Sequence, residues 1–138
     1  MLTLEEQVKL VLDNDATFQS LVVTPGGAYA AGEVWTVPLD AKYPHVSWAS
    51  ATDGGGGPAD VSTTRKARLI FWVESQSSRV QAKTIAARIE VLFHRQQATV
   101  SSSSIGIYML KLSGAPVTLR EPRTNAHQVT LEFEVTAQ

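Results

Sequence analysis

The segment from residue 66 to residue 96 constrains the fold more than any other part of this chain. Residues 66–75, KARLIFWVES, predict a strand, because apolar side chains recur at every second position. One face would carry Ala67, Leu69, Phe71 and Val73. The other face would carry Ile70 and Trp72 between charged residues. A strand with apolar residues on both faces belongs in the centre of a sheet, or its second face meets another subunit.

A helix is predicted immediately after this strand, over residues 77–96, SSRVQAKTIAARIEVLFHRQ. Its apolar residues recur at helical spacing on one side: Ala82, Ile85, Ala86, Ile89, Leu92 and Phe93. Lys83 and Arg88 lie away from that side, and Ser77 or Ser78 can cap the first turn. We therefore expect an amphipathic helix that covers one face of the sheet.

The remaining elements follow from similar patterns. A first helix is indicated by the capping pair Thr3 and Glu6 and by an apolar face of Leu4, Val8, Val11 and Leu12. Residues 13–15 end it, and the apolar residues 18–23 are interpreted as packing material. Further strands are predicted at residues 33–37, 44–52, 105–112, 117–121 and 129–136. In the last strand Val129, Leu131, Phe133 and Val135 would face inward.

The order of these elements favours the α+β class. It runs helix, strands, helix, strands, without the strict β–α–β alternation of a doubly wound fold. We expect a mostly antiparallel sheet of four or more strands, with two helices packed on one face. The length of 138 residues is that of one ordinary domain, so residues 1–138 are expected to form a single unit.

The glycine run in TDGGGGPADV, residues 52–61, raises the question of phosphate binding. Gly54, Gly56 and Ala59 satisfy the letters of a dinucleotide fingerprint, but a polar run and a strand follow where that motif needs a helix. A small phosphate-binding enzyme is therefore the less favoured alternative. The 14-residue connection 52–65 is interpreted instead as a mobile hairpin tip that a partner orders.

No set of residues in the sequence points to catalysis. The absence of cysteine excludes disulfides and thiolate-bound metals. His45, His94 and His127 lack the spacing of a metal site, and no G-x-S-x-G motif is present. Glu132 and Glu134 would share the outward face of the last strand, as solvated or intersubunit carboxylates. We expect no enzyme and no catalytic, cofactor-binding or metal-binding residue.

Charge and hydropathy narrow the class of partners. Twelve basic and thirteen acidic residues give a net charge of -1, which argues against a dedicated nucleic-acid-binding module. Basic residues form two weak clusters, Arg65, Lys66 and Arg68 beside the glycine run, and Arg120 with Arg123 near the last turn. Each cluster is either ordinary solvated surface or a docking or DNA-facing patch. No signal peptide and no apolar run of about 20 residues is found, so an intracellular product without a membrane span is expected.

The order of elements resembles the tail-completion or tail-terminator proteins of long-tailed bacteriophages and phage-like particles. The resemblance covers nearly the whole chain and is one of pattern. It is carried by the segments LEEQVKLVLDNDATFQSLV, YPHVSWAS, RLIFWVESQSSRVQAKTIAARIEVLF, IGIYMLKLSGAPVTLREP and HQVTLEFEV.

The resemblance implies an assembly role. Members of the family are α+β subunits that form rings, typically of six, which cap the tail tube and join it to the head connector. It implies as partners further copies of the chain, the major tail tube protein and the connector or neck protein, with DNA passing through the ring without sequence-specific binding. The expected place is the virion tail or neck, assembled in the host bacterial cytoplasm. Residues expected to contact partners are Asp53, Gly54, Gly55, Gly56, Gly57, Arg65, Lys66, Arg68, Arg120 and Arg123. The alternatives are a neck or head-closure protein or another minor tail subunit.

Overall fold

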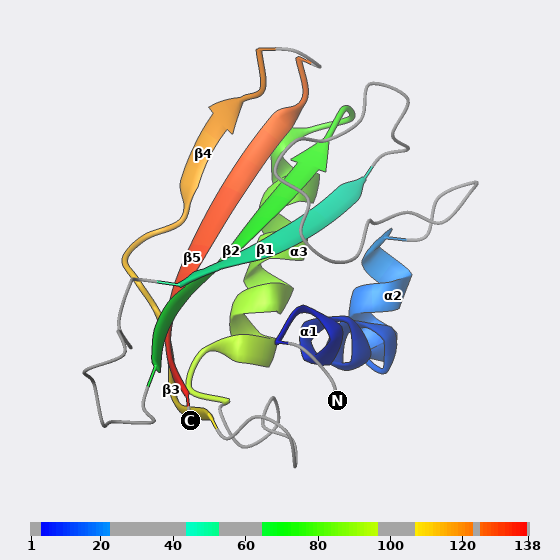
Figure 1. Ribbon diagram of the computed structural model, residues 1–138. Coiled ribbons are helices and arrows are strands. Elements are labelled where there is room, and N and C mark those ends of the chain that lie inside the picture. The colour runs from blue at the N-terminus through cyan, green and yellow to red at the C-terminus, as the bar shows by residue number, and fades with distance from the viewer. Residues whose placement is uncertain (1–3, 23–43, 53–64, 97–106, 123–124, 138) are drawn as a thin grey trace.

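The computed structural model describes residues 4–22, 44–52, 65–96, 107–122 and 125–137 (Figure 1). The elements, in chain order, are α1 (Leu4–Asp13), α2 (Ala16–Val22), β1 (His45–Thr52), β2 (Arg65–Ser75), α3 (Arg79–Phe93), β3 (Ile107–Leu112), β4 (Val117–Arg120) and β5 (His127–Ala137). The strands form one sheet in which every pairing is antiparallel, and the helices pack against one face of it. The predicted α+β class with a mostly antiparallel sheet is confirmed.

The sheet has the order β1–β2–β5–β3, and β4 also pairs with β5. Since β2 occupies one side of β5 along its whole length, β3 and β4 lie one after the other on the opposite side. Leu112 pairs with Phe133 and Val117 with Thr130, so four residues of this edge, 113–116, stand opposite two residues of β5, 131 and 132. The edge is therefore a single interrupted strand with a bulge, in which Gly114 adopts a φ of +106°.

Four aromatic side chains fix α3 over the middle of the sheet. Phe71 of β2 and Phe133 of β5 pack against Phe93 of α3, Trp48 of β1 packs against Phe71, and all four are buried. The ring centroid of Phe71 lies 5.1 Å from that of Phe93 and 5.7 Å from that of Phe133. Such aromatic pairs add about 0.5–1.5 kcal/mol each beyond the burial of their area. The cluster determines which face of α3 turns inward.

The helix α3 forms as the sequence predicts. Ser78 is its N-cap, and its Oγ accepts a hydrogen bond from the backbone N–H of Gln81 at 3.1 Å. The predicted inner face is confirmed. Leu92 packs against the core, and five residues of this face are buried: Ala82, Ile85, Ala86, Ile89 and Phe93.

A third helix, α2, was not predicted. The sequence predicts residues 13–15 only as the end of the first helix, but Asp15 also caps the start of the next one. Its Oδ2 accepts a hydrogen bond from the backbone N–H of Phe18 at 2.7 Å. The same carboxylate receives two hydrogen bonds from Arg88 of α3, from Nε at 2.9 Å and Nη2 at 2.7 Å. The hydrogen bond from the Arg88 guanidinium holds the pKa of Asp15 below its usual value. This ion pair joins the α1–α2 turn to α3.

Most of the other predicted elements lie within the described residues, and some lie outside them. The five strands over 45–52, 65–75, 107–112, 117–120 and 127–137 confirm five predicted ones. The inward face of β5 is confirmed, since Val129, Leu131, Phe133 and Val135 are buried. The last strand, β5, begins at His127, two residues before its predicted start. The predicted strand at 33–37, the glycine connection 53–64 and residue Thr3 lie outside the described residues.

Candidate assembly surface

The sheet has a second face, turned away from the helices. The register places Ile70 and Trp72 of β2 there, with Thr130 and Glu132 of β5 as their neighbours. Ile70 and Trp72 are half-buried, whereas Trp48 on the helix-covered face is fully buried. The prediction that the 66–75 strand is central and apolar on both faces is therefore confirmed, because β2 lies between β1 and β5.

The basic residues at the start of β2 are interleaved with carboxylates. Lys66 and Arg68 are exposed, and Arg68 Nη1 lies 3.4 Å from Glu132 Oε1. Glu134 is the cross-strand neighbour of Arg68 on one side and of Lys111 of β3 on the other. The backbone of Arg65 begins the strand opposite Ala137. This end of the open face is a mixed-charge surface, which suits polar contact with a protein better than a uniform field for DNA.

The second basic cluster lies at the other end of the sheet. Arg120 ends β4 opposite His127, and its Nη2 donates to the backbone oxygen of Asn125 at 3.1 Å. Because β5 runs from His127 to Ala137, beside Arg65, the two clusters are separated by nearly the full length of this strand, roughly 30 Å. The structure does not bring them together. Asp53, the four glycines 54–57 and Arg123 lie outside the described residues.

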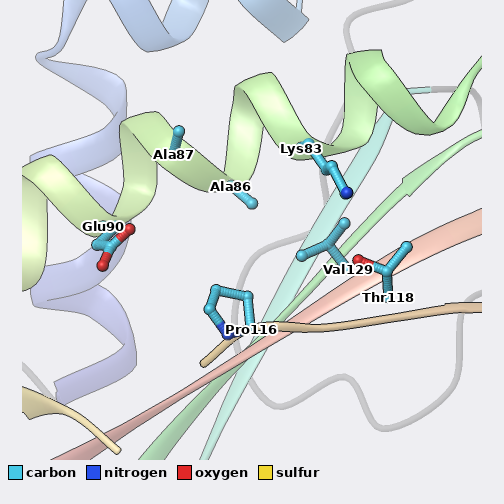
Figure 2. Close-up of a pocket in the computed structure, with 7 residues that line it drawn as sticks. All are labelled: Lys83, Ala86, Ala87, Glu90, Pro116, Thr118 and Val129. Carbon is cyan, nitrogen blue, oxygen red and sulfur yellow. The ribbon is translucent and has the colours of Figure 1, made fainter. Parts of the chain in front are cut away.

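A groove that the sequence did not reveal runs between α3 and the β4 edge (Figure 2). It encloses about 280 Å³ and is lined by Lys83, Ala86, Ala87 and Glu90 of α3, by Pro116 and Thr118 of the edge, and by Val129 of β5. Figure 2 shows Lys83 and Glu90 at its two ends along the helix, with the smaller apolar side chains between them. The paired alanines are the one signal in the sequence, since small side chains on a helix leave room beside the sheet.

Exposed apolar side chains also lie on α3 and on β4, the two elements that form the groove. On α3 they are Val80 and Val91, and on β4 they are Val117 and Leu119. All four residues of β4 are exposed, and β5 is its partner on one side. Val117 and Leu119 are the cross-strand neighbours of Thr130 and Gln128, so they lie on the open face of the sheet, away from the groove. Exposed apolar side chains of this kind are typical of a protein-binding surface rather than of a site for chemistry.

Buried polar groups cluster at one end of the sheet, on three neighbouring strands. Glu74 of β2 is the cross-strand neighbour of both His45 and Gln128, and Gln128 Nε2 donates to Glu74 Oε1 at 2.7 Å. All three residues are buried. Burial lowers the pKa of His45, which keeps the imidazole neutral near pH 7. The cluster is a network within the sheet, and a neutral buried imidazole serves packing here.

The described residues contain neither a cluster of potential metal ligands nor a helix that could span a membrane. No group of three or more His, Cys, Asp or Glu residues there could hold a metal ion. His94, one of the three histidines, accepts a hydrogen bond at Nδ1 from the N–H of Leu112 at 3.0 Å. Among the described helices, none has the length and apolar character needed to cross a membrane.

Comparison with known proteins places the fold. The sequence matches no protein family, and no curated protein is similar to it in sequence. A solved structure with the same fold is a chain of the virion of a native gene transfer agent particle, with a TM-score of 0.69 and 18% sequence identity. The match covers 94% of this chain and 90% of that chain. This α+β sheet with its helices on one face is thus a fold that a chain of a phage-like particle also has.

Proposed function

We propose that this chain is a structural subunit of a phage-like particle, and specifically a ring-forming tail terminator that caps the tail tube and joins it to the head connector. The observation that carries the proposal is the fold shared with a chain of a gene transfer agent virion over nearly the full length of both chains. The resemblance of the elements to tail-terminator proteins supports the finer role. Its place would be the tail or neck of the virion.

The surface described above supports an assembly role. A ring of identical subunits needs two different contact surfaces on each subunit, one for each neighbour. The groove between α3 and β4 offers one surface, and the open face of the sheet, with the mixed charges of β2 and β5 and the exposed Val117 and Leu119 of β4, offers a second. A ring of six follows from the resemblance.

The proposed contacts with the tail tube protein and the connector lie in and beside the glycine connection. They are Asp53, Gly54, Gly55, Gly56, Gly57, Arg65, Lys66 and Arg68, with Arg120 at the opposite end of the sheet and Arg123 three residues after it in the chain. A ring stacked between a tube and a connector has two ends, and basic residues at both ends of the sheet fit two such partners. A neck or head-closure protein is the alternative, since it would use the same two ends.

Complementation of a particle that lacks this gene tests the proposal. Without the chain, electron microscopy should show tails that are overlong or not attached to heads, and the wild-type chain should restore both. The double variant Lys66→Glu, Arg68→Glu should fold but restore head–tail joining poorly. The control is Arg79→Glu, an exposed charge reversal at the start of α3, which should restore it fully. Particles with tails of normal length joined to heads in the absence of the chain would refute the terminator role.

A further inference from the structure

The outer surface of α3 carries a stripe of four exposed side chains, Val80, Thr84, Ala87 and Val91. The spacing i, i+4, i+7, i+11 places them in one line along the helix, opposite the buried residues that face the sheet. Val80 is 72% exposed and Val91 is 61% exposed. This spacing is that of the seam along which one helix packs against another. We call these four residues the outer stripe.

The outer stripe is symmetric about its own midpoint, between Ile85 and Ala86. If a second copy of α3 lies antiparallel on the first, Val80 of each copy meets Val91 of the other, and Thr84 meets Ala87. The larger side chains then lie at the two ends of the contact and the smaller ones at its centre. Small central residues allow the helix axes to approach to the usual distance of about 8–10 Å.

Charge selects the antiparallel arrangement over the parallel one. Lys83 and Glu90 lie on the same flank of the outer stripe, beside the groove, and seven residues apart, or roughly 10.5 Å along the helix. In an antiparallel pair, Lys83 of each copy lies beside Glu90 of the other, so two ion pairs form. In a parallel pair, this flank of one copy would lie beside the opposite flank of the other, so these two ion pairs would not form. Within the described part of the chain, neither side chain has an ion-pair partner.

The charge on the opposite flank of the outer stripe does not repel a second copy. Its charged residue is Arg88, which donates two hydrogen bonds to Asp15 of its own chain. A guanidinium already paired with a carboxylate presents little net charge to a second copy.

We propose that two copies of this chain associate through the outer stripes of α3, antiparallel, about a twofold axis. A twofold contact uses the same surface on both subunits and closes at two, whereas a ring uses two different surfaces. The twofold contact includes Lys83, Ala87 and Glu90, which also line the groove proposed for the ring, so the dimer competes with that ring contact. The contact is one helix face, so the dimer is weak and depends on concentration.

Sedimentation equilibrium of the full-length chain at low salt tests the proposal. Wild-type protein should show a monomer–dimer equilibrium. Val91→Asp should weaken the dimer by roughly tenfold or more, because it places a charge in the seam. The matched control is Leu10→Asp on α1, where the leucine is 44% exposed and lies outside the outer stripe, and this change should leave the dimer unaltered.

A charge exchange between Lys83 and Glu90 gives the sharper test. Lys83→Glu alone and Glu90→Lys alone should each weaken the dimer roughly threefold to tenfold, because each creates two like-charged contacts. The double variant should restore the wild-type affinity. Circular dichroism and thermal unfolding establish that every variant is folded.

Two results would overturn the inference. One is a folded chain that stays monomeric at all concentrations. The other is a dimer that the double exchange fails to restore, or that Leu10→Asp disrupts as strongly as Val91→Asp, since the contact would then lie elsewhere. Neither result bears on the tail-terminator role, which is measured on particles.

Discussion

Replacing Phe93 by alanine should remove a large part of the stability of the fold. The side chain is fully buried between α3 and the sheet, with ring centroids 5.1 Å from Phe71 and 6.2 Å from Phe133. Truncation loses the transfer free energy of the ring and leaves a cavity between rigid strands, a combined cost of about 3–5 kcal/mol. The whole free energy of unfolding of a domain is only about 5–15 kcal/mol. We therefore expect a folded but markedly weakened protein.

Urea unfolding monitored by tryptophan fluorescence measures this loss, since Trp48 lies 6.3 Å from Phe71 in the same cluster. With a slope of about 2 kcal/mol per molar urea, the midpoint should fall by roughly 2 M. Val91→Ala is the control on the same helix, and its exposed position predicts a change within about 0.5 kcal/mol. A loss below about 1 kcal/mol for Phe93→Ala, or equal losses for the two variants, would refute the assignment of the inner face of α3.

Three further predictions concern local features of the fold. The lowered pKa of Asp15 stabilises the fold above the normal carboxyl pKa of 3.8, and this contribution is lost as pH falls through the folded value. Unfolding free energies measured from pH 6 to pH 2 should therefore converge for wild type and Asp15→Asn at the acid end, and a constant gap would contradict the ion pair with Arg88. Ser78→Ala should cost about 1 kcal/mol in urea unfolding, because the N-cap acceptor is lost, whereas Ser78→Asp should keep most of it. Gly114→Ala should cost about 1–3 kcal/mol although nothing lies within 4 Å of the new methyl group, since φ is +106° there; a neutral thermal melt would contradict this.

The elements with strong periodicity could be predicted from sequence, and the short ones could not. The strand at 66–75, the helix after it and the last strand each bury the side chains that their spacing indicates. The helix α2 has only seven residues, too few for a clear repeat, and the acidic residue that caps it also follows α1. Asp15 also pairs with Arg88, which is 73 residues away in sequence, and local sequence patterns cannot reveal such a contact.

The candidate surface was less predictable than the fold. The groove joins α3 to residues of β4 and β5 more than 20 positions away, so it exists only through tertiary packing. The predicted strands put one basic cluster at the start of the 66–75 strand and Arg120 near the end of the 117–121 strand. The pairing of both strands with β5, which separates the two clusters along its length, could not be predicted from the sequence. The exposed valines on the outside of α3 could not be recognised from the sequence, because the buried residues of the helix already account for its apolar repeat.

The bulge at residues 113–116 has a consequence for solubility. A strand from another molecule that tried to extend the sheet at this edge in continuous register would meet the break after the six residues of β3 or the four of β4. Pro116 adds a position without an amide donor next to that break. Runaway strand addition of the amyloid kind needs a long, flat edge, and this one is short and bent. This edge of the sheet is therefore a poor template for fibre growth.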